Sequence, residues 1–225
     1  MTTLIAIDGP AGTGKSSVSR YLAQHLDFIY VDTGAIYRSL AYLVSKYSVN
    51  PDDVDGVLLL IPRIEIMVDK KNHCTRAIID SQPVGDGLRT EEISRLASII
   101  SQHGRVREAL LSIQRDLALV IEKGAIFEGR DIGTVVFPKA DVKIFITANS
   151  ETRARRRYNE LKSLNKDITY DDILQSIKRR DQRDETRAAS PTQRAADAHI
   201  IDTSDLTLTE VIDKALSLIK SAIKV

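Results

Sequence analysis

The sequence predicts an α/β fold of three layers, in which a parallel sheet of five strands lies between helices and carries a small inserted subdomain. Three patterns support this prediction. Short continuous apolar runs are typical of strands that are buried on both faces of a parallel sheet. Amphipathic helical patterns alternate with these runs, as they do in βα units. Two segments of alternating apolar and polar residues interrupt that order and predict an inserted β-hairpin.

The first two βα units are expected within the first 50 residues. Residues 4–7 are an uninterrupted apolar run that ends at Asp8, and they predict a buried strand. Residues 17–26 then place apolar side chains at helical spacing. A second strand over 28–31 and a second helix through 36–44 repeat the arrangement. The carboxyl ends of the two strands are therefore expected at the same edge of the sheet.

Residues 52–103 differ in character and predict the inserted subdomain. A short helix is expected over 54–61. Residues 64–68 and 75–79 alternate apolar and polar side chains around a polar turn, which predicts the hairpin. A helix over 90–103 leads back to the main fold. After the insertion, three more strands are expected at 125–128, 142–146 and 198–201, and four helices at 105–122, 151–164, 170–187 and 208–223.

The composition predicts a soluble globular protein and disfavours several function classes. With 43% hydrophobic and 28% charged residues over 225 positions, the chain has enough apolar side chains for a core. Its formal net charge of +1 argues against a broad cationic surface for nucleic acid or anionic lipid. We expect neither a secretory signal nor a membrane segment. The single cysteine, Cys74, excludes an intramolecular disulfide and agrees with a reducing cytoplasm.

The most specific motif follows the first strand. Residues 9–16 fit the phosphate-loop pattern G-x-x-x-x-G-K-[ST] between a strand and a helix. Its glycines let backbone N–H groups turn toward phosphate oxygens, and the positive end of the helix adds to the attraction. Lys15 can reach the β- and γ-phosphates of a nucleoside triphosphate, and the Ser16 hydroxyl can ligate Mg²⁺. We expect the loop to comprise Gly9, Pro10, Ala11, Gly12, Thr13, Gly14, Lys15, Ser16 and Ser17.

The loop alone does not decide between a kinase, a GTPase and a motor-type ATPase. A GTPase reads guanine with Asn-Lys-x-Asp after a later strand. In the nearest string, Asn165-Lys166-Asp167, the acid stands one place too early, and the string lies between two predicted helices. The sequence therefore disfavours a GTPase.

Further polar residues are expected beside the loop, because they follow other strands of the sheet. Thr33, Tyr37 and Arg38 follow the second strand and are expected to line a second pocket. After the next strand along the sequence, Arg130 is a candidate phosphate clamp. Glu128 and Asp131 are candidates for binding ligand hydroxyls, ligand amines or Mg²⁺-bound water.

Arginines are unusually frequent in the second half of the chain: 13 of the 19 lie between Arg105 and Arg194. Two sets have the spacing of a single helix face, namely Arg153, Arg156 and Arg157, and Arg180, Arg183, Asp184 and Arg187. The second set holds three arginines against one acid, so its repulsion is uncompensated unless an anion binds. Two neighbouring phosphate sites suit phosphoryl transfer, which depends on positioning and charge neutralisation.

Five strings together resemble the bacterial cytidylate kinase family: GPAGTGKSS at 9–17, DTGAIYR at 32–38, GRVREAL at 104–110, EGRDIGTVVFP at 128–138 and RDQRDETR at 180–187. The resemblance covers nearly the whole chain. It implies a P-loop kinase fold in one domain, 1–225, with an insertion, 52–103, that binds the nucleoside monophosphate. It further implies a lid and following helix at 151–190, and ATP-dependent phosphorylation of CMP and dCMP with Mg²⁺.

The resemblance also implies roles for individual residues. It places Ser98, Arg107 and Asp131 on the cytosine, Arg180 and Asp184 on the ribose, and Arg38, Arg130 and Arg187 on the monophosphate. It places Lys15, Arg130, Arg153, Arg156 and Arg157 around the transferring phosphate. An Asp131 carboxylate that accepts from the cytosine amine would reject uracil, because two acceptors would then face each other. The chain has Thr33 where the family can have Ser, and Glu128 where it can have Asp.

Two other functions remain open at this point. One is a different small-metabolite or nucleotide kinase with the same clamp. The other is a nucleotide-gated binding module that hydrolyses ATP or GTP slowly. For partners we expect small-molecule nucleotides, without nucleic acid or membrane, and we expect a cytoplasmic monomer.

Overall fold

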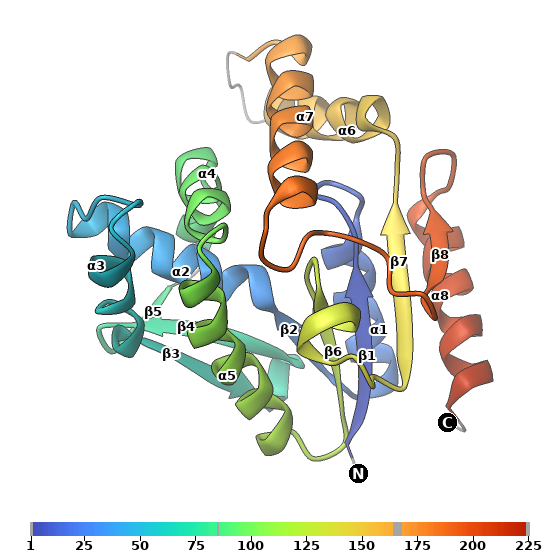
Figure 1. Cartoon of the computed structure of the whole chain (residues 1–225). Helices are drawn as coiled ribbons and strands as arrows, with labels where there is room; N and C mark the ends of the chain where they lie inside the picture. Colours follow the sequence, from blue (N-terminus) through green and yellow to red (C-terminus); the bar gives the residue numbers. More distant parts are fainter. Residues whose placement is uncertain (1, 85, 164–167, 224–225) are drawn as a thin grey trace.

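Five parallel strands form the centre of the structure. The computed structural model describes residues 2–84, 86–163 and 168–223 (Figure 1). Over these residues the central strands follow the order β2-β6-β1-β7-β8. Their bounds are Ile29–Asp32 for β2, Gly124–Glu128 for β6, Thr3–Asp8 for β1, Val142–Thr147 for β7 and His199–Asp202 for β8. All five were predicted to within a few residues.

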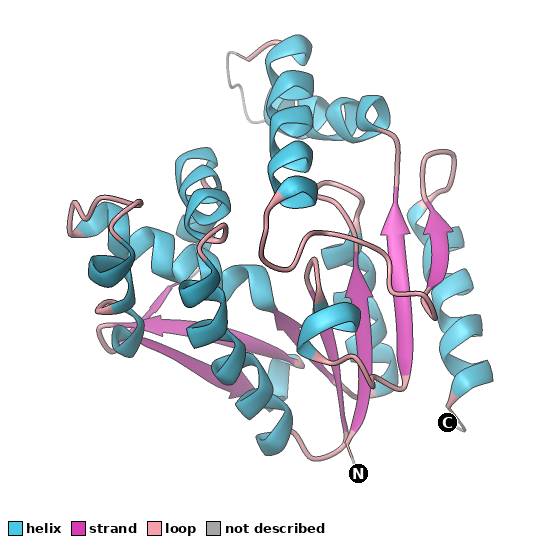
Figure 2. Ribbon diagram, viewed as in Figure 1, coloured by secondary structure: helices cyan, strands magenta, loops and turns pink. Residues whose placement is uncertain are grey.

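Helices cover both faces of these strands (Figure 2). In β1, Ile5 and Ile7 pack into a core with α1 (Lys15–Leu26) and α8 (Leu208–Ala222). Ala6, between them, belongs to a second core with α2 (Thr33–Lys46) and α5 (Gly104–Val120). Successive side chains of a strand point to opposite faces, so both faces need apolar residues. This two-sided burial explains the uninterrupted apolar runs and confirms the three-layer α/β fold.

The sheet is larger than the five parallel strands that we predicted. Strands β3 (Ile64–Asp69) and β4 (Cys74–Ile79) form the predicted antiparallel hairpin, and β5 (Gln82–Val84), which was not predicted, pairs with β4. The hairpin extends the central sheet, because β4 lies parallel to β2 and the Tyr30 N–H donates to the His73 carbonyl at 2.9 Å. Over the described residues this gives one mixed sheet of eight strands. The hairpin covers an edge of β2 that would otherwise expose unpaired backbone groups.

The helices of the insertion are shorter than predicted. The helix expected over 54–61 ends as α3 at Leu58, and a short 3₁₀ turn that contains Pro62 follows at Ile61–Arg63. The helix expected over 90–103 is α4, Glu91–Ile100. Thr90 caps α4, since its hydroxyl oxygen accepts the Ile93 N–H at 3.2 Å. The helix α5 begins soon afterwards, at Gly104.

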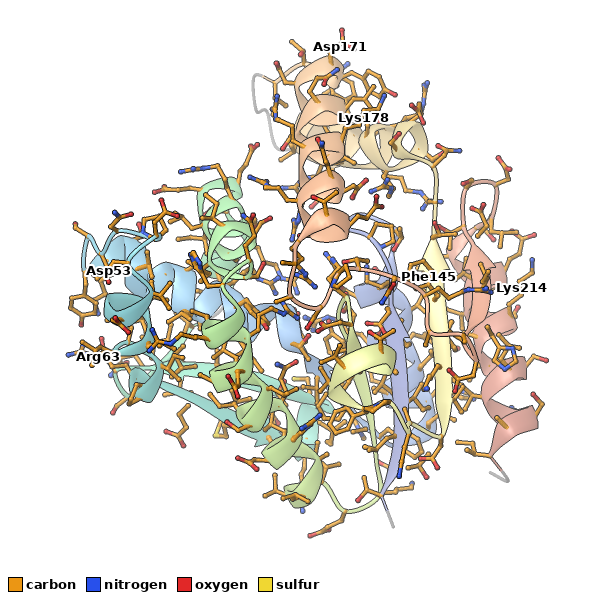
Figure 3. The ribbon with its side chains drawn as sticks, viewed as in Figure 1. Asp53, Arg63, Phe145, Asp171, Lys178 and Lys214 are labelled. Atoms are coloured by element: carbon orange, nitrogen blue, oxygen red, sulfur yellow. The ribbon has the colours of Figure 1, made fainter. Side chains whose placement is uncertain are left out.

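Two helices lie above the carboxyl ends of β1 and β7 in Figure 1. These are α6 (Ser150–Ser163) and α7 (Tyr170–Thr186), which pack on each other around Ala154, Leu161 and Ile173. Figure 3 shows side chains filling the space between α7, on which Lys178 is labelled, and the strand ends. Leu164, the predicted end of the first helix, and the string Asn165 to Asp167 lie outside the described residues. None of the described helices combines the length and the apolar character needed to cross a membrane.

Asp8 joins the end of β1 to a turn that no sequence pattern indicated. This turn is a π-helix, Ile132–Val136, directly after Asp131. The buried Asp8 carboxylate accepts the Ile132 N–H at 2.8 Å and the Gly133 N–H at 2.7 Å. Burial raises the pKa of Asp8 to about 6, against the opposing effect of the two N–H groups. The phosphate loop and the Arg130–Asp131 segment are therefore fixed to each other through one carboxylate.

The raised pKa of Asp8 predicts a pH-dependent loss of stability. Between its ordinary pKa and about 6, folded Asp8 holds a proton that the unfolded chain releases. The free energy of unfolding therefore falls as pH rises through this range. Relative to Asp8→Asn, which does not titrate, the unsubstituted protein should lose about 1 kcal/mol between pH 5 and pH 7. Urea unfolding of both proteins at the two pH values measures this loss. If the two proteins differ in free energy of unfolding by the same amount at pH 5 and at pH 7, the prediction is wrong.

Candidate active site

The phosphate loop connects β1 to α1 through glycines that the packing or the backbone conformation requires. Gly9 has φ 141°, and a Cβ on it would lie 1.9 Å from the Ile146 carbonyl oxygen of β7. Gly14 has φ 91° and caps α1, which begins at Lys15, two residues earlier than predicted. Both glycines adopt backbone conformations that residues with side chains rarely take. The loop is thus held tightly against β7, with the exposed Ser17 in the first turn of α1.

The Lys15 side chain is buried under its own loop. Its Nζ donates to the Pro10 carbonyl at 2.6 Å and to the Thr13 hydroxyl at 3.4 Å. Burial, followed by the positive charge of Arg130, lowers the pKa of Lys15 to about 7. An anion next to the Nζ would reverse this shift, so the loop is built to receive negative charge.

Ser16 and Glu128 place oxygen atoms beside the loop. The Ser16 hydroxyl donates to Glu128 Oε1 at 3.0 Å, and the Tyr30 hydroxyl donates to Glu128 Oε2 at 2.5 Å. The Thr33 hydroxyl donates to the Glu128 carbonyl at 2.7 Å. Hydroxyl and carboxylate oxygens fit Mg²⁺, which keeps several of its waters and uses few protein ligands. The described residues include no group of three or more His, Cys, Asp or Glu able to hold a metal. A magnesium ion here would thus depend on Ser16, Glu128 and a bound nucleotide.

A cluster of arginines lies around Asp184 of α7. Arg130 Nε donates to Asp184 Oδ2 at 3.3 Å, and Arg180 Nε is 3.9 Å from the same oxygen. Burial, followed by the charge of Arg130, lowers the pKa of Arg180 to about 10, and Arg38 adds to the effect. Buried guanidinium nitrogens without a hydrogen-bond partner occur on Arg38, Arg107, Arg180, Arg183 and Arg187. Such repulsion and unmet donors mark a site for an anion with several oxygens.

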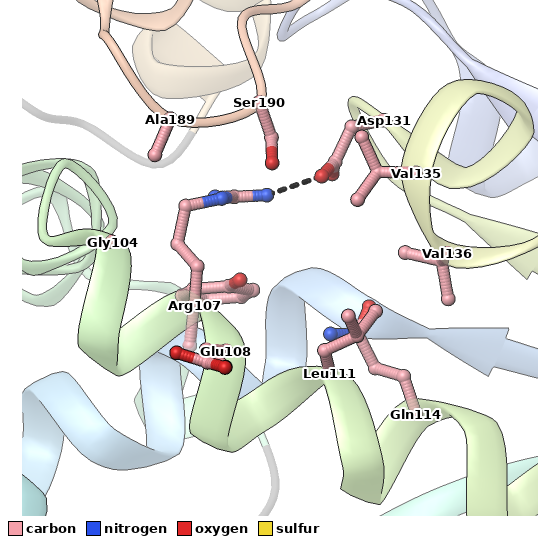
Figure 4. A pocket seen from close by; sticks show the side chains of 11 residues that line it. Gly104, Arg107, Glu108, Leu111, Gln114, Asp131, Val135, Val136, Ala189 and Ser190 are labelled. Atoms are coloured by element: carbon pink, nitrogen blue, oxygen red, sulfur yellow. Dashed lines mark hydrogen bonds and ion pairs between the residues drawn. The ribbon is translucent and has the colours of Figure 1, made fainter.

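A pocket of about 180 Å³ opens between α5, the π-helical turn and the segment after α7 (Figure 4). Across it, Arg107 Nη2 donates to Asp131 Oδ2 at 2.5 Å. Arg187 Nη2 lies 4.0 Å from Asp131 Oδ1. The Arg107 guanidinium lies over the Tyr37 ring, with its Cζ atom 5.3 Å from the centre of the ring. The pocket is also lined by Leu111, Gln114, Val135, Val136 and Ser190. The lining thus combines a charged donor and acceptor with aliphatic, aromatic and other polar side chains.

Ser98 lies outside the pocket that holds Arg107 and Asp131. Its hydroxyl donates to Asp184 Oδ1 at 3.5 Å, and it does not line the pocket of Arg107 and Asp131. The structure therefore brings Ser98 next to the residue expected on the ribose, on the side where α4 faces α7.

The three α6 arginines that the sequence analysis singled out have different environments. Arg153 is buried and donates to the Ala11 carbonyl of the phosphate loop at 3.0 Å and to both Asp181 oxygens at 3.0 and 2.6 Å. Arg156 donates to the Thr203 hydroxyl at 3.0 Å and to its carbonyl at 2.5 Å. Arg157 pairs with Glu160 at 2.8 Å and is 40% exposed. Among these three arginines, and over the residues that the structure describes, Arg153 is the one with a hydrogen bond to the phosphate loop.

Sequence reasoning missed several residues that shape this site: Asp8, Tyr30, Arg89, Asp181 and Thr203. Asp8 and Tyr30 belong to strands whose patterns indicated only burial. Asp181 stands within the RDQRDETR string, although its pairing with Arg153 depends on how α7 packs on α6. No local pattern distinguishes Thr203.

Comparisons with known proteins agree with the motifs. The family model described as cytidylate kinase matches residues 5–221. The cytidylate kinase of Geobacter sulfurreducens is 42% identical over 217 residues, covering 96% of this chain and 92% of that protein. That of Caldicellulosiruptor bescii is 41% identical over 220 residues, covering 98% and 96%. A solved structure of an uncharacterized protein from Eubacterium ventriosum has a TM-score of 0.55 at 12% identity, covering 98% of this chain and 99% of that one.

The solved structure shows likeness of fold alone. The sequence matches extend over almost the full length of both partners and include the phosphate loop and every string that carried the resemblance. The chain therefore belongs to the cytidylate kinase family and has its α/β P-loop kinase fold.

Proposed function

We propose that this protein transfers the γ-phosphoryl group of ATP to CMP and dCMP, forming CDP and dCDP. The observation that carries the proposal is the position of two adjacent residues. Arg130 acts electrostatically on Lys15 of the phosphate loop, and Asp131 forms a wall of the neighbouring pocket with Arg107. A triphosphate on the loop and a nucleoside monophosphate in the pocket would therefore meet at Arg130. The relatives described as cytidylate kinases support this choice of acceptor.

In this proposal the acceptor base occupies the pocket of Arg107 and Asp131. The Asp131 carboxylate accepts from the exocyclic amine of cytosine, and Tyr37 packs on the nucleotide. Thr33, whose hydroxyl donates to the Glu128 carbonyl, also belongs to the proposed acceptor site. Asp184 and Arg180 hold the ribose, with Ser98 beside them. Arg38, Arg130 and Arg187 bind the monophosphate, whose oxygens would meet the unmet guanidinium donors of Arg38 and Arg187.

The chemistry needs little from the protein beyond placement and charge. Lys15 exchanges the Pro10 carbonyl for triphosphate oxygens, and Arg130 neutralises charge between donor and acceptor. Mg²⁺, held through Ser16 with Glu128 nearby, would neutralise phosphate charge when bound. Helices α6 and α7 form the lid over 151–190 and exclude water. Arg153 is already beside the loop, whereas Arg156 and Arg157 reach the transferring phosphate only when the lid closes further.

The proposed reaction predicts a clear order among acceptors. With ATP and Mg²⁺, CMP and dCMP should give kcat/KM values roughly 100-fold above that of UMP, because a buried mismatch of acceptors is strongly disfavoured. An assay of ADP release over a panel of nucleotides and small metabolites measures this order. A better acceptor outside the cytidine nucleotides would indicate a different kinase. Slow hydrolysis that CMP does not stimulate would indicate a nucleotide-gated binding module.

Substitution of Asp131 tests base recognition. In Asp131→Asn the amide can donate to uracil O4 as well as pair with cytosine, so the kcat/KM ratio of CMP over UMP should fall about 100-fold. Asp116→Asn, at an exposed position of α5, is the matched control and should keep the ratio. Steady-state kinetics with both acceptors provide the measurement. An unchanged ratio in Asp131→Asn would remove Asp131 from base recognition.

The lowered pKa of Lys15 predicts proton uptake when ATP binds. With a pKa of about 7, Lys15 is mostly neutral at pH 8 before binding. Triphosphate oxygens restore the charged form, so binding at pH 8 should take up roughly one proton. Calorimetry in two buffers of different ionisation enthalpy measures this uptake. In Lys15→Arg the side chain at this position is always protonated, so this variant should bind ATP without proton uptake. Equal uptake in both proteins would contradict the assignment.

A further inference from the structure

Two hydroxyl groups from different elements bind one carboxylate beside the phosphate loop. Glu128 Oε1 accepts the Ser16 hydroxyl at 3.0 Å, and Oε2 accepts the Tyr30 hydroxyl at 2.5 Å. Tyr30 and Glu128 are both buried, with only 2% and 8% of their surface exposed. Ser16 belongs to the first turn of α1. The carboxylate at the end of β6 is therefore bound to β2 on one side and to the start of α1 on the other.

The packing of β2, β6 and α1 fixes the Tyr30 ring. Tyr30 is the register partner of Ile126, and both side chains belong to the core that α1 covers. Glu128 lies two residues beyond Ile126, so its side chain points to the same face of the sheet. On α1, Arg20 follows Ser16 by one turn, and its Cζ atom lies 5.0 Å from the centre of the Tyr30 ring. The ring is thus held between the sheet and α1, with its hydroxyl on the carboxylate.

The chemistry of the carboxylate decides how the Ser16 hydroxyl is oriented. A carboxylate only accepts hydrogen bonds, so the hydroxyl hydrogen of Ser16 points toward Glu128. The lone pairs of the Ser16 oxygen then point away from Glu128 and can bind a cation. Tyr30 holds the other carboxylate oxygen, and the carboxylate cannot turn without breaking this buried hydrogen bond. The Tyr30 hydroxyl therefore acts on Ser16 through Glu128.

We propose that Tyr30 is a positioning residue for the metal site: it holds Glu128, which orients the Ser16 hydroxyl so that its lone pairs can bind the Mg²⁺ that accompanies ATP. This proposal rests on the donor half of the proposed function, and it assigns Tyr30 no contact with the metal. Groups that orient a metal ligand typically change the metal affinity about 10- to 100-fold when they are removed. A hydroxyl that only joins β2 to β6 would stabilise the fold without this effect.

The affinity of Mn²⁺ for the protein bound to a nonhydrolysable ATP analogue tests the proposal, because no phosphoryl transfer is needed. Tyr30→Phe keeps the ring in the core and removes the hydroxyl, so Mn²⁺ affinity should fall about 10-fold. Electron paramagnetic resonance of Mn²⁺ measures this fall, and the affinity of the analogue without metal should stay unchanged. Tyr21→Phe is the matched control, since Tyr21 also lies against α1 residues but is 46% exposed. This variant should keep both affinities.

A double-mutant cycle tests whether Tyr30 acts through Ser16. In Ser16→Ala the hydroxyl that Glu128 orients is missing, and phosphate oxygens of the analogue are left to hold the metal. Adding Tyr30→Phe to this variant should therefore weaken Mn²⁺ binding no further, although each substitution alone weakens it. The same measurement on all four proteins gives the cycle.

Two results would overturn the proposal. Unchanged Mn²⁺ affinity in Tyr30→Phe would show that the hydroxyl only stabilises the fold. An undiminished effect of Tyr30→Phe in the Ser16→Ala background would show that Tyr30 does not act through Ser16. Failure of the proposed acceptor is separate, because neither measurement contains CMP. A protein that phosphorylates a different acceptor would still lose Mn²⁺ affinity in Tyr30→Phe, while ADP release with CMP would tell whether the acceptor itself is right.

Discussion

The parallel alignment of β2, β6, β1 and β7 is the constraint on which the whole site depends. Each of these strands ends at the same edge of the sheet, so the residues that follow them meet in space although they are far apart in the chain. Asp8 and the phosphate loop follow β1, Thr33 follows β2, and Arg130 follows β6. Burial of the strands on both faces keeps this edge rigid. The loops can therefore carry polar and charged residues without weakening the core.

Charge at this edge explains much of the local structure. Burial lowers the pKa of Lys15 and of Arg180, and the positive charge of Arg130 lowers both further. The protein offsets part of the repulsion with its own acids, such as Asp32 for Arg38 and Asp184 for Arg130. In these pairs the carboxylates accept hydrogen bonds from guanidinium groups that could otherwise donate to phosphate oxygens. When a ligand binds, we therefore expect its phosphate oxygens to replace these carboxylates as acceptors for the arginines that are already at the site.

Helix α7 connects the two proposed nucleotide sites. Through Asp181 it holds Arg153, which contacts the phosphate loop, and through Asp184 it contacts Arg130 and Ser98. The segment after it contributes Arg187 and Ser190 to the region around Asp131. A movement of α7 would therefore act on the proposed donor and acceptor sites together, as the proposed lid would require when it closes over both.

The sequence by itself determined the elements of this protein and its phosphate loop, because periodicity and glycine spacing are local properties. The strands, most helices and the hairpin follow from such patterns, and five short strings identified the family. Only the tertiary structure decided which elements join. The hairpin extends the sheet through Tyr30 and Cys74, Asp8 holds a π-helical turn 124 residues away, and Arg89 meets Asp32 across 57 residues. Such contacts leave no periodic trace in the chain, since they depend on packing geometry between distant segments.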